Sequence, residues 1–190
     1  MASFDLLDRA AHEFDNRLRL VTAAQHALPT PCGEFSVRDL VAHQIYGMRG
    51  FTLLLNGAPR EGAEAFEGGD IGPADWVGVF NSDYQVMRDA FDAPGALERT
   101  VRHPIMGDIP ASMLFDIRVN ELAVHAWDLA RAIGADETLD SDVVASIWAF
   151  GEPMAEILPS LGIFGSGASG TVPDSAPLQT RLLDLLGRRP

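Results

Sequence analysis

The sequence has little cysteine and few basic residues, and both shortages exclude classes of protein. Its one cysteine, Cys32, allows no disulfide within the chain, which fits a reducing compartment such as the cytoplasm. Lysine and arginine number 14 against 27 acidic residues, so the formal net charge is -13. Nucleic acids and anionic membranes both recruit clustered positive charge. We therefore expect no nucleic acid and no membrane among the partners.

Long apolar runs are missing as well. The longest uncharged, mostly apolar stretch covers residues 143–150 and is far too short to span a bilayer. The N-terminus is acidic and amphipathic, which is not the pattern of a signal peptide. Apolar residues make up 47% of the chain and charged residues 22%, as in ordinary globular proteins. The 190 residues are enough for one hydrophobic core, so we predict a single cytoplasmic domain over residues 1–190.

Hydrophobic periodicity predicts an all-α protein. Apolar residues recur every three or four positions in four long segments, at residues 4–26, 36–56, 73–93 and 111–133. Loops rich in glycine and proline separate these segments. Four long helices with modest links predict a four-helix bundle over about residues 3–134.

Local signals mark several helix ends. Ser36 is expected to cap the second helix, with Asp39 completing a capping box. Pro73 suits the first turn of the third helix, after an acidic, glycine-rich loop over residues 61–72. Gly134 is expected to end the fourth helix in a left-handed conformation.

The remaining elements are shorter. They are a hairpin or an extended link over residues 100–104 and 107–110, a fifth helix over 140–158, a loop over 161–177 and a last helix over 178–186. Pro153 is expected to kink or shorten the fifth helix. We predict that the C-terminal helices and loop, residues 140–190, pack outside the bundle.

Glu121 and His125 are the first candidate metal ligands. They lie four residues apart in the fourth predicted helix, so they project from one face about 6 Å apart along the axis. A carboxylate oxygen and an imidazole nitrogen one turn apart can hold one metal ion. The same spacing also suits a surface pair joined by a simple hydrogen bond.

His43 is the third candidate ligand. It lies about two turns into the second predicted helix, on a side that is otherwise apolar, where an imidazole without a partner would cost stability. A lone histidine there can also be a packed residue at the core boundary. With Glu121 and His125 it predicts a site with three protein ligands and one open position, the arrangement of catalytic zinc.

Three segments carry a resemblance to a known family. Residues 120–132, NELAVHAWDLARA, resemble the E-L-x-V-H-x-W-D-L-A signature of actinobacterial proteins related to mycothiol-dependent maleylpyruvate isomerase. These proteins belong to the DinB/YfiT-like metal-binding superfamily. Residues 30–43, TPCGEFSVRDLVAH, are similar to the family's entry to its second helix, and residues 164–190 are similar to its C-terminal end.

The resemblance implies a fold, a site and a chemistry. The fold is the DinB-like four-helix bundle, and the metal ligands map to His43, Glu121 and His125. Glu-x-x-x-His stands where many superfamily members have His-x-x-x-His, as it does in the maleylpyruvate isomerase branch. The chain is expected to lack the separate C-terminal domain of the full-length isomerase. The implied cofactors are a divalent metal such as zinc and a low-molecular-weight thiol such as mycothiol, which attacks a small-molecule electrophile.

Three functions stay open on this basis. The first is a metal-dependent thiol transferase or isomerase, in which the metal would lower the pKa of a bound thiol. The second is a metal-dependent hydrolase that activates water at the same site. The third is a metal-binding or stress-response module without catalysis.

Two charged residues flank the predicted ligands. Arg118, about one turn before Glu121, would either hold a substrate carboxylate or form a salt bridge with Glu121 or Asp116. Asp128 would either accept a hydrogen bond from a ligand histidine or face solvent.

The other candidates favour structural roles. Cys32 precedes a helix whose dipole lowers thiol pKa values, but packing as a small hydrophobe under the loop is the favoured interpretation. The remaining histidines are expected on the surface: His12, His26 and His103. Trp148 and Phe150 are expected to expose apolar surface that a homodimer would cover.

Overall fold

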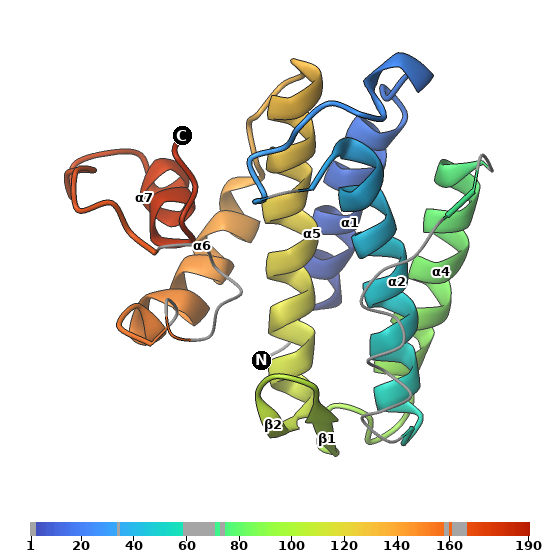
Figure 1. The fold of residues 1–190 in the computed structure, drawn as a ribbon. Coiled ribbons are helices and arrows are strands. Elements are labelled where there is room, and N and C mark those ends of the chain that lie inside the picture. Colours follow the sequence, from blue (N-terminus) through green and yellow to red (C-terminus); the bar gives the residue numbers. More distant parts are fainter. Residues whose placement is uncertain (1–2, 34, 59–70, 73–74, 158–159, 161–166) are drawn as a thin grey trace.

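Four long helices form a bundle (Figure 1). The computed structural model describes residues 3–33, 35–58, 71–72, 75–157, 160 and 167–190. The bundle helices are α1 (Phe4–Leu18), α2 (Val37–Leu55), α4 (Trp76–Asp92) and α5 (Ala111–Ile133). Both α1 and α2 pack against α4 and α5, so the four helices close around one core. The predicted all-α bundle is confirmed.

The apolar stripes that predicted the helices also build the core. In α1 the fully buried positions Leu7, Ala10 and Phe14 follow the expected spacing of three and four. Phe14 stacks on Phe80 of α4 with 5.0 Å between ring centroids. The same stripe that makes α1 amphipathic therefore positions it against its neighbours.

The capping signals act as predicted at both helices that carry the candidate site. Ser36 accepts a hydrogen bond from the Asp39 N–H, and the Asp39 carboxylate accepts one from the Ser36 N–H at 3.0 Å. This capping box holds the start of α2. Helix α5 ends at Gly134, whose φ of 71° is the left-handed conformation that glycine adopts without strain.

Helix α1 is shorter than predicted, because it ends at Leu18 rather than near His26. Thr22 takes an extended backbone and its N–H donates to the Gln25 side chain at 2.9 Å, which starts the short 3-10 helix η1 (Ala23–Gln25). A threonine that caps a new turn in this way competes with continuation of the helix.

The fifth predicted helix is divided in two. Helix α6 (Ser141–Gly151) is followed by the 3-10 helix η2 (Glu152–Met154), because Pro153 has no N–H to continue an α-helix. The predicted end of this helix at residue 158 lies outside the described residues, as do Pro73 and most of the predicted loop 61–72.

A two-stranded hairpin covers the end of the bundle where α5 begins (Figure 1). Strands β1 (Thr100–His103) and β2 (Gly107–Pro110) pair antiparallel, with Val101 opposite Ile109. Both of these side chains are buried. The hairpin is thus confirmed over the alternative of an extended link.

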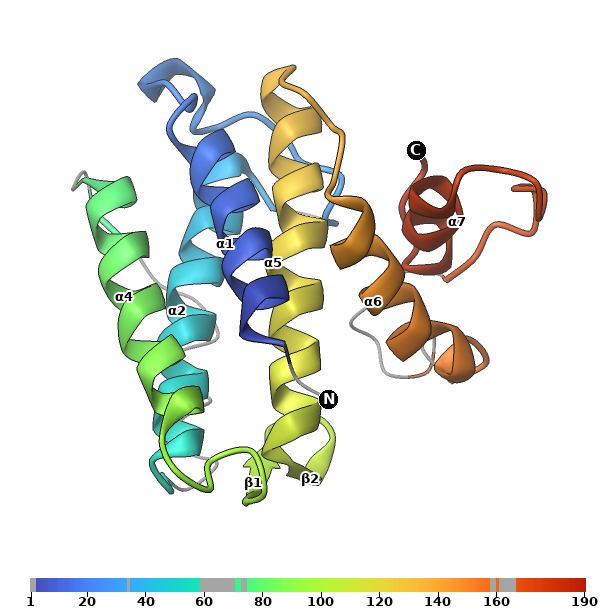
Figure 2. The same ribbon diagram turned by 180° about the vertical axis from the view of Figure 1, so that it is seen from behind.

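Helices α6 and α7 (Leu178–Leu185) lie outside the bundle, where α6 packs on α5 and α7 packs on α6 (Figure 2). Trp148 and Phe150 of α6 are half-buried, and the guanidinium of Arg181 covers the Trp148 ring at 4.5 Å. These two residues are therefore only partly exposed, and the homodimer stays a prediction. No helix in the described part of the chain combines the length and apolar character needed to cross a membrane.

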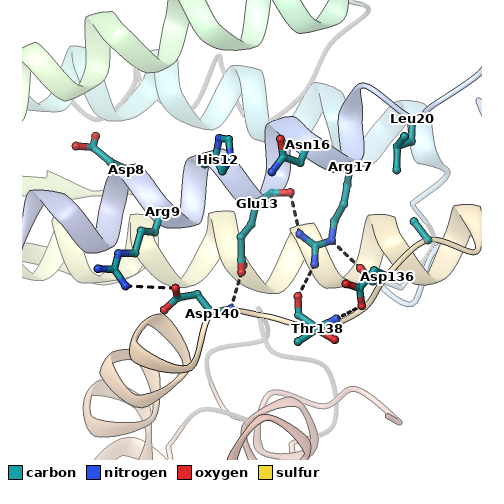
Figure 3. A pocket seen from close by; sticks show the side chains of 11 residues that line it. Asp8, Arg9, His12, Glu13, Asn16, Arg17, Leu20, Asp136, Thr138 and Asp140 are labelled. Atoms are coloured by element: carbon teal, nitrogen blue, oxygen red, sulfur yellow. Dashed lines mark hydrogen bonds and ion pairs between the residues drawn. The ribbon is translucent and has the colours of Figure 1, made fainter.

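A surface hollow of about 650 Å³ lies where α1 meets the segment that joins α5 to α6 (Figure 3). Arg17 reaches across it and donates to the backbone carbonyls of Glu13, Asp136 and Thr138, at 2.9, 3.1 and 2.6 Å. No predicted site residue lines this hollow. Its polar contacts instead join α1 to the segment that leads to the C-terminal helices.

We predict that Arg17→Met lowers the free energy of unfolding by about 1–3 kcal/mol, because three carbonyl groups lose a charged donor. Arg19→Met is the matched control, since this side chain is 55% exposed and its partner Asp15 keeps a second donor in Asn81. We expect the control to lose less than about 1 kcal/mol. Urea denaturation of both variants measures the difference, and equal losses would contradict the prediction.

Candidate metal centre

Helices α2 and α5 bring the three predicted ligands together. Nε2 of His43 lies 2.9 Å from Oε2 of Glu121, and Nε2 of His125 lies 3.2 Å from the same oxygen. One ligand atom from each residue lies within 4.8 Å of the other two. The turn of α5 places Glu121 beside His125, and the packing of α2 on α5 supplies His43.

The cluster is open on one side. The side chains of His43 and Glu121 are 31% and 23% exposed, whereas His125 is only 7% exposed. The ring of Phe35 lies 5.5 Å from the His43 ring and adds an apolar wall. Solvent therefore reaches the cluster at His43 and Glu121, whereas His125 is nearly enclosed.

Asp128 binds the imidazole nitrogen of His125 that does not face Glu121. Its Oδ2 lies 2.9 Å from Nδ1 of His125, and the carboxylate is fully buried, so the solvent-facing alternative is wrong. Burial alone would raise the pKa of Asp128, but hydrogen bonds from His125 and Arg188 outweigh it and lower the pKa. An ionised carboxylate only accepts hydrogen bonds, so Nδ1 of His125 carries a proton and donates it.

This tautomer leaves Nε2, the other imidazole nitrogen, without a proton when the ring is neutral. Nε2 of a neutral His125 presents a lone pair to Oε2 of Glu121 across 3.2 Å. Burial alone would raise the pKa of Glu121, but His125 and His43 lower it well below its ordinary value, so this carboxylate is also an anion. Two acceptors at that distance repel each other unless a cation lies between them.

The cation between the two atoms can be either a proton or a metal ion. Burial alone would lower the pKa of His125, but Asp128 and Glu121 outweigh it and raise the pKa, so the metal-free cluster favours a proton. The donor set also fits a divalent ion, because zinc takes imidazole nitrogen and carboxylate oxygen ligands. Zinc bonds of about 2.1 Å in a tetrahedral arrangement place ligand atoms about 3.4 Å apart, within the spacing of the cluster. His43, Glu121 and His125 would hold such an ion.

Arg118 lies buried beside this cluster, on the turn of α5 before Glu121. Its side chain donates from Nη2 to Oε1 of Gln44, the residue after His43. Within the described residues, neither its Nε nor the Gln44 Nε2 has a hydrogen-bond partner. No ion pair joins Arg118 to Glu121 or Asp116 among those residues, and burial lowers the Arg118 pKa to about 10.

Gly47 of α2 makes room for this arginine. A Cβ atom at position 47 would lie 2.9 Å from Nη1 of Arg118, closer than the two atoms can pack. Glycine thus admits the guanidinium between α2 and α5.

Cys32 packs next to the cluster without being activated. Its Sγ lies within 4.8 Å of ligand atoms of His125 and Asp128. Burial raises the pKa of the thiol to about 11, whereas activation by the dipole of the following helix would lower it. The half-buried side chain packs against the core, as the favoured structural interpretation predicted.

The other histidines divide between surface and interior. His12 is exposed as predicted, and His26 is half-buried, stacked on Trp76 at 4.0 Å. The surface prediction for His103 is wrong, because its residue is 8% exposed. Its Nδ1 accepts the backbone N–H groups of residues 105 and 106 at 3.2 Å each. Strand alternation with buried Val101 is the signal that would have placed His103 inward.

No sequence pattern singled out Arg188 as a site residue. The residue is 7% exposed and contacts Asp128 of α5. No local pattern marks it, because its partner lies 60 residues away in the sequence.

The sequence profile described as the mycothiol maleylpyruvate isomerase N-terminal domain matches residues 7–130, which include all three candidate ligands. The chain belongs to this family. Two relatives from Mycobacterium tuberculosis, uncharacterized proteins MT0763 of strain CDC 1551 / Oshkosh and Rv0738 of strain ATCC 25618 / H37Rv, are each 30% identical over 135 residues. The matched region covers 71% of this family member and 69% of each relative.

Solved structures support the fold of this family member. Crystal structures of the mycothiol-dependent maleylpyruvate isomerase and of a histidine-to-alanine mutant match with TM-scores of 0.59 and 0.62 at 17% sequence identity. The match covers 75% of this chain and 65% of the isomerase chain. At this identity the likeness establishes the shared DinB-like helical fold.

We predict that His103 makes stability depend on pH. Burial lowers its pKa, so the folded state binds fewer protons here than the unfolded state, and stability falls as the pH drops below the unfolded value of about 6.5. The loss is at most about 1.4 kcal/mol per pH unit until the folded pKa is reached. The variant His103→Asn should show a shallower loss between pH 7 and 5 in urea denaturation. His12→Asn, at an exposed position, should follow the parent chain, and parallel profiles for all three would contradict the prediction.

Proposed function

We propose that this protein is a metal-dependent enzyme that acts on a small electrophile with a low-molecular-weight thiol such as mycothiol. It either transfers the thiol to the electrophile or uses the thiol to isomerise it. His43, Glu121 and His125 hold a divalent cation, zinc by the chemistry of the donor set. The family assignment supports the thiol, and the name of the structurally similar isomerase suggests maleylpyruvate as the first electrophile to test.

One observation carries the proposal. The Nε2 atoms of two histidines converge on one oxygen of an anionic carboxylate, while Asp128 keeps the remaining proton of His125 on the far nitrogen. This arrangement leaves lone pairs directed at one position and supplies the hydrogen-bonded support that histidine ligands of metals usually have. A surface pair would need neither the buried Asp128 nor a third converging side chain.

When bound, a divalent cation supplies a Lewis acid that lowers the pKa of a thiol or a water at its open position. The residues around that position act by placement. Glu121 offsets one positive charge, so the centre keeps a net charge near +1 that favours an anionic ligand. The partial exposure of His43 leaves the approach open, and Phe35 shields the edge of the imidazole from water.

Arg118 and Gln44 provide the second half of the proposed site. Both are buried, and each has a donor without an acceptor inside the described part of the protein. An unpaired buried donor costs about 1–3 kcal/mol, more when it is charged, so a carboxylate supplied by a substrate would satisfy both groups. We propose that Arg118 binds a carboxylate of the electrophile one helical turn from the metal.

The metal is tested by elemental analysis of protein purified from medium with added zinc. We expect about one zinc ion per chain, and we expect His43→Ala and Glu121→Gln to lose it because two ligands do not hold the ion tightly. His12→Ala, on an exposed turn of α1, is the control and should keep the metal. A metal-free parent chain would refute the proposal and favour a module without metal chemistry.

The reaction class is tested with the same preparations. Conversion of maleylpyruvate that requires both the metal and mycothiol supports the proposal. Hydrolysis of an ester or amide without any thiol would instead assign the site to a metal-dependent hydrolase.

We predict that Arg118→Met raises KM for maleylpyruvate by about 10–100-fold, which corresponds to loss of one hydrogen-bonded charge pair. Gly47→Ala should raise KM in the same direction, because the added methyl group displaces the guanidinium while keeping its charge. The zinc content should stay unchanged in both variants. Arg49→Met, which removes a surface pair with Asp83, is the control. An unchanged KM in both test variants would exclude Arg118 from substrate binding.

A further inference from the structure

The last residues of the chain turn back onto α5. Gly187, just after α7, has a φ of 77°, and the Arg188 N–H donates to the Leu183 carbonyl at 2.8 Å. This left-handed turn ends the helix and directs the Arg188 side chain toward the bundle. The guanidinium then lies buried, and its Nη1 donates to the Leu186 carbonyl at 2.9 Å.

Arg188 donates two hydrogen bonds to the carboxylate of Asp128. Nη2 lies 2.7 Å from Oδ2 and Nε lies 3.2 Å from Oδ1 of the carboxylate. A two-pronged contact of this kind restricts rotation of the carboxylate, which a single point charge does not. Oδ2 is also the oxygen that accepts Nδ1–H of His125. The orientation of the ring is thus linked through one atom to the C-terminal segment.

We propose that Arg188 is a positioning residue of the metal centre. It fixes Asp128, and Asp128 fixes the imidazole of His125 so that Nε2 points at the position shared with His43 and Glu121. The inference rests on the proposed function, because it needs His125 to be a metal ligand. Arg188 lies outside residues 7–130, which the family profile matches, so a C-terminal segment beyond that region supports the centre.

The alternative role of Arg188 is only to dock the chain end, and the structure offers a way to separate the two. Leu182 and Leu186 are fully buried or nearly so and hold α7 by apolar contact without Arg188. Arg189 contacts Asp184 at 3.5 Å, and its carbonyl accepts from Arg131, but no hydrogen bond or ion pair joins it to Asp128 among the described residues. Arg189→Ala is therefore a control of the same residue type in the same segment.

The test uses Co²⁺ as a spectroscopic probe of the centre. The parent chain, Arg188→Ala, Arg188→Lys, Arg189→Ala, Asp128→Asn and the double variant Arg188→Ala/Asp128→Asn are each titrated against a competing chelator, and their ligand-field absorption is recorded. Loss of a residue that supports a ligand typically weakens metal binding about 10–100-fold. We expect that loss, with a shifted spectrum, for Arg188→Ala and Asp128→Asn. Arg189→Ala should match the parent chain.

Two further comparisons identify positioning as the cause. The double variant should bind Co²⁺ no more weakly than the weaker single variant, because both changes break one chain of contacts. Arg188→Lys should lie between the parent chain and Arg188→Ala, since lysine keeps the charge but not the two-pronged geometry. Additive losses would assign the effects to separate causes and overturn the inference.

The remaining outcomes are decisive as well. Parent-like affinity and spectrum in Arg188→Ala would show that the residue only docks the chain end. If Arg188→Ala unfolds, the Co²⁺ affinities of Arg188→Lys and Asp128→Asn test the inference instead. Weakened binding in these variants supports positioning, and parent-like binding overturns it. A parent chain that binds no Co²⁺ refutes the proposed function, and the inference with it, which separates that failure from a failure of Arg188 alone.

Discussion

Asp128 has no exposed surface, and its two oxygens accept hydrogen bonds from His125 and Arg188. A buried, ionised carboxylate without partners would strongly destabilise the folded state, and these two contacts offset that cost. They set the tautomer of His125, and the tautomer in turn requires a cation between this ring and Glu121. The chemistry proposed for the protein depends on this one buried anion.

The bundle supplies the rigid frame for that arrangement. Glu121 and His125 share a face of α5 because of the helical repeat. The capping box fixes where α2 begins, and so fixes the position of His43 along that helix. Sites on helices hold ligand atoms more rigidly than sites on loops. The side chain of His43 is 31% exposed, so the cluster meets solvent at this histidine.

The interface of α2 and α5 also buries polar residues whose hydrogen bonding is incomplete within the described residues. Arg118 and Gln44 are buried between α2 and α5 with unpaired donors in the part of the chain that the structure describes, and Gly47 makes the space for them. Local arrangements that reduce stability concentrate at functional sites, because selection there acts on binding and chemistry. Together with the family assignment of residues 7–130, this supports one continuous site of metal ligands and an adjacent anion subsite.

The sequence by itself determined the features that depend on neighbouring residues. The helical repeat placed Glu121 beside His125, the Ser36 signal marked the start of α2, and Gly134 marked the end of α5, since each signal and its effect lie within a few residues. The apolar side of the second predicted helix pointed to His43, and the resemblance supported it, although its partner is 78 residues away. Only the tertiary structure decided that Arg118 is buried beside Gln44, that His103 faces inward, and that Arg188 meets Asp128. These contacts join segments far apart in the chain, and packing between elements sets them rather than any local pattern.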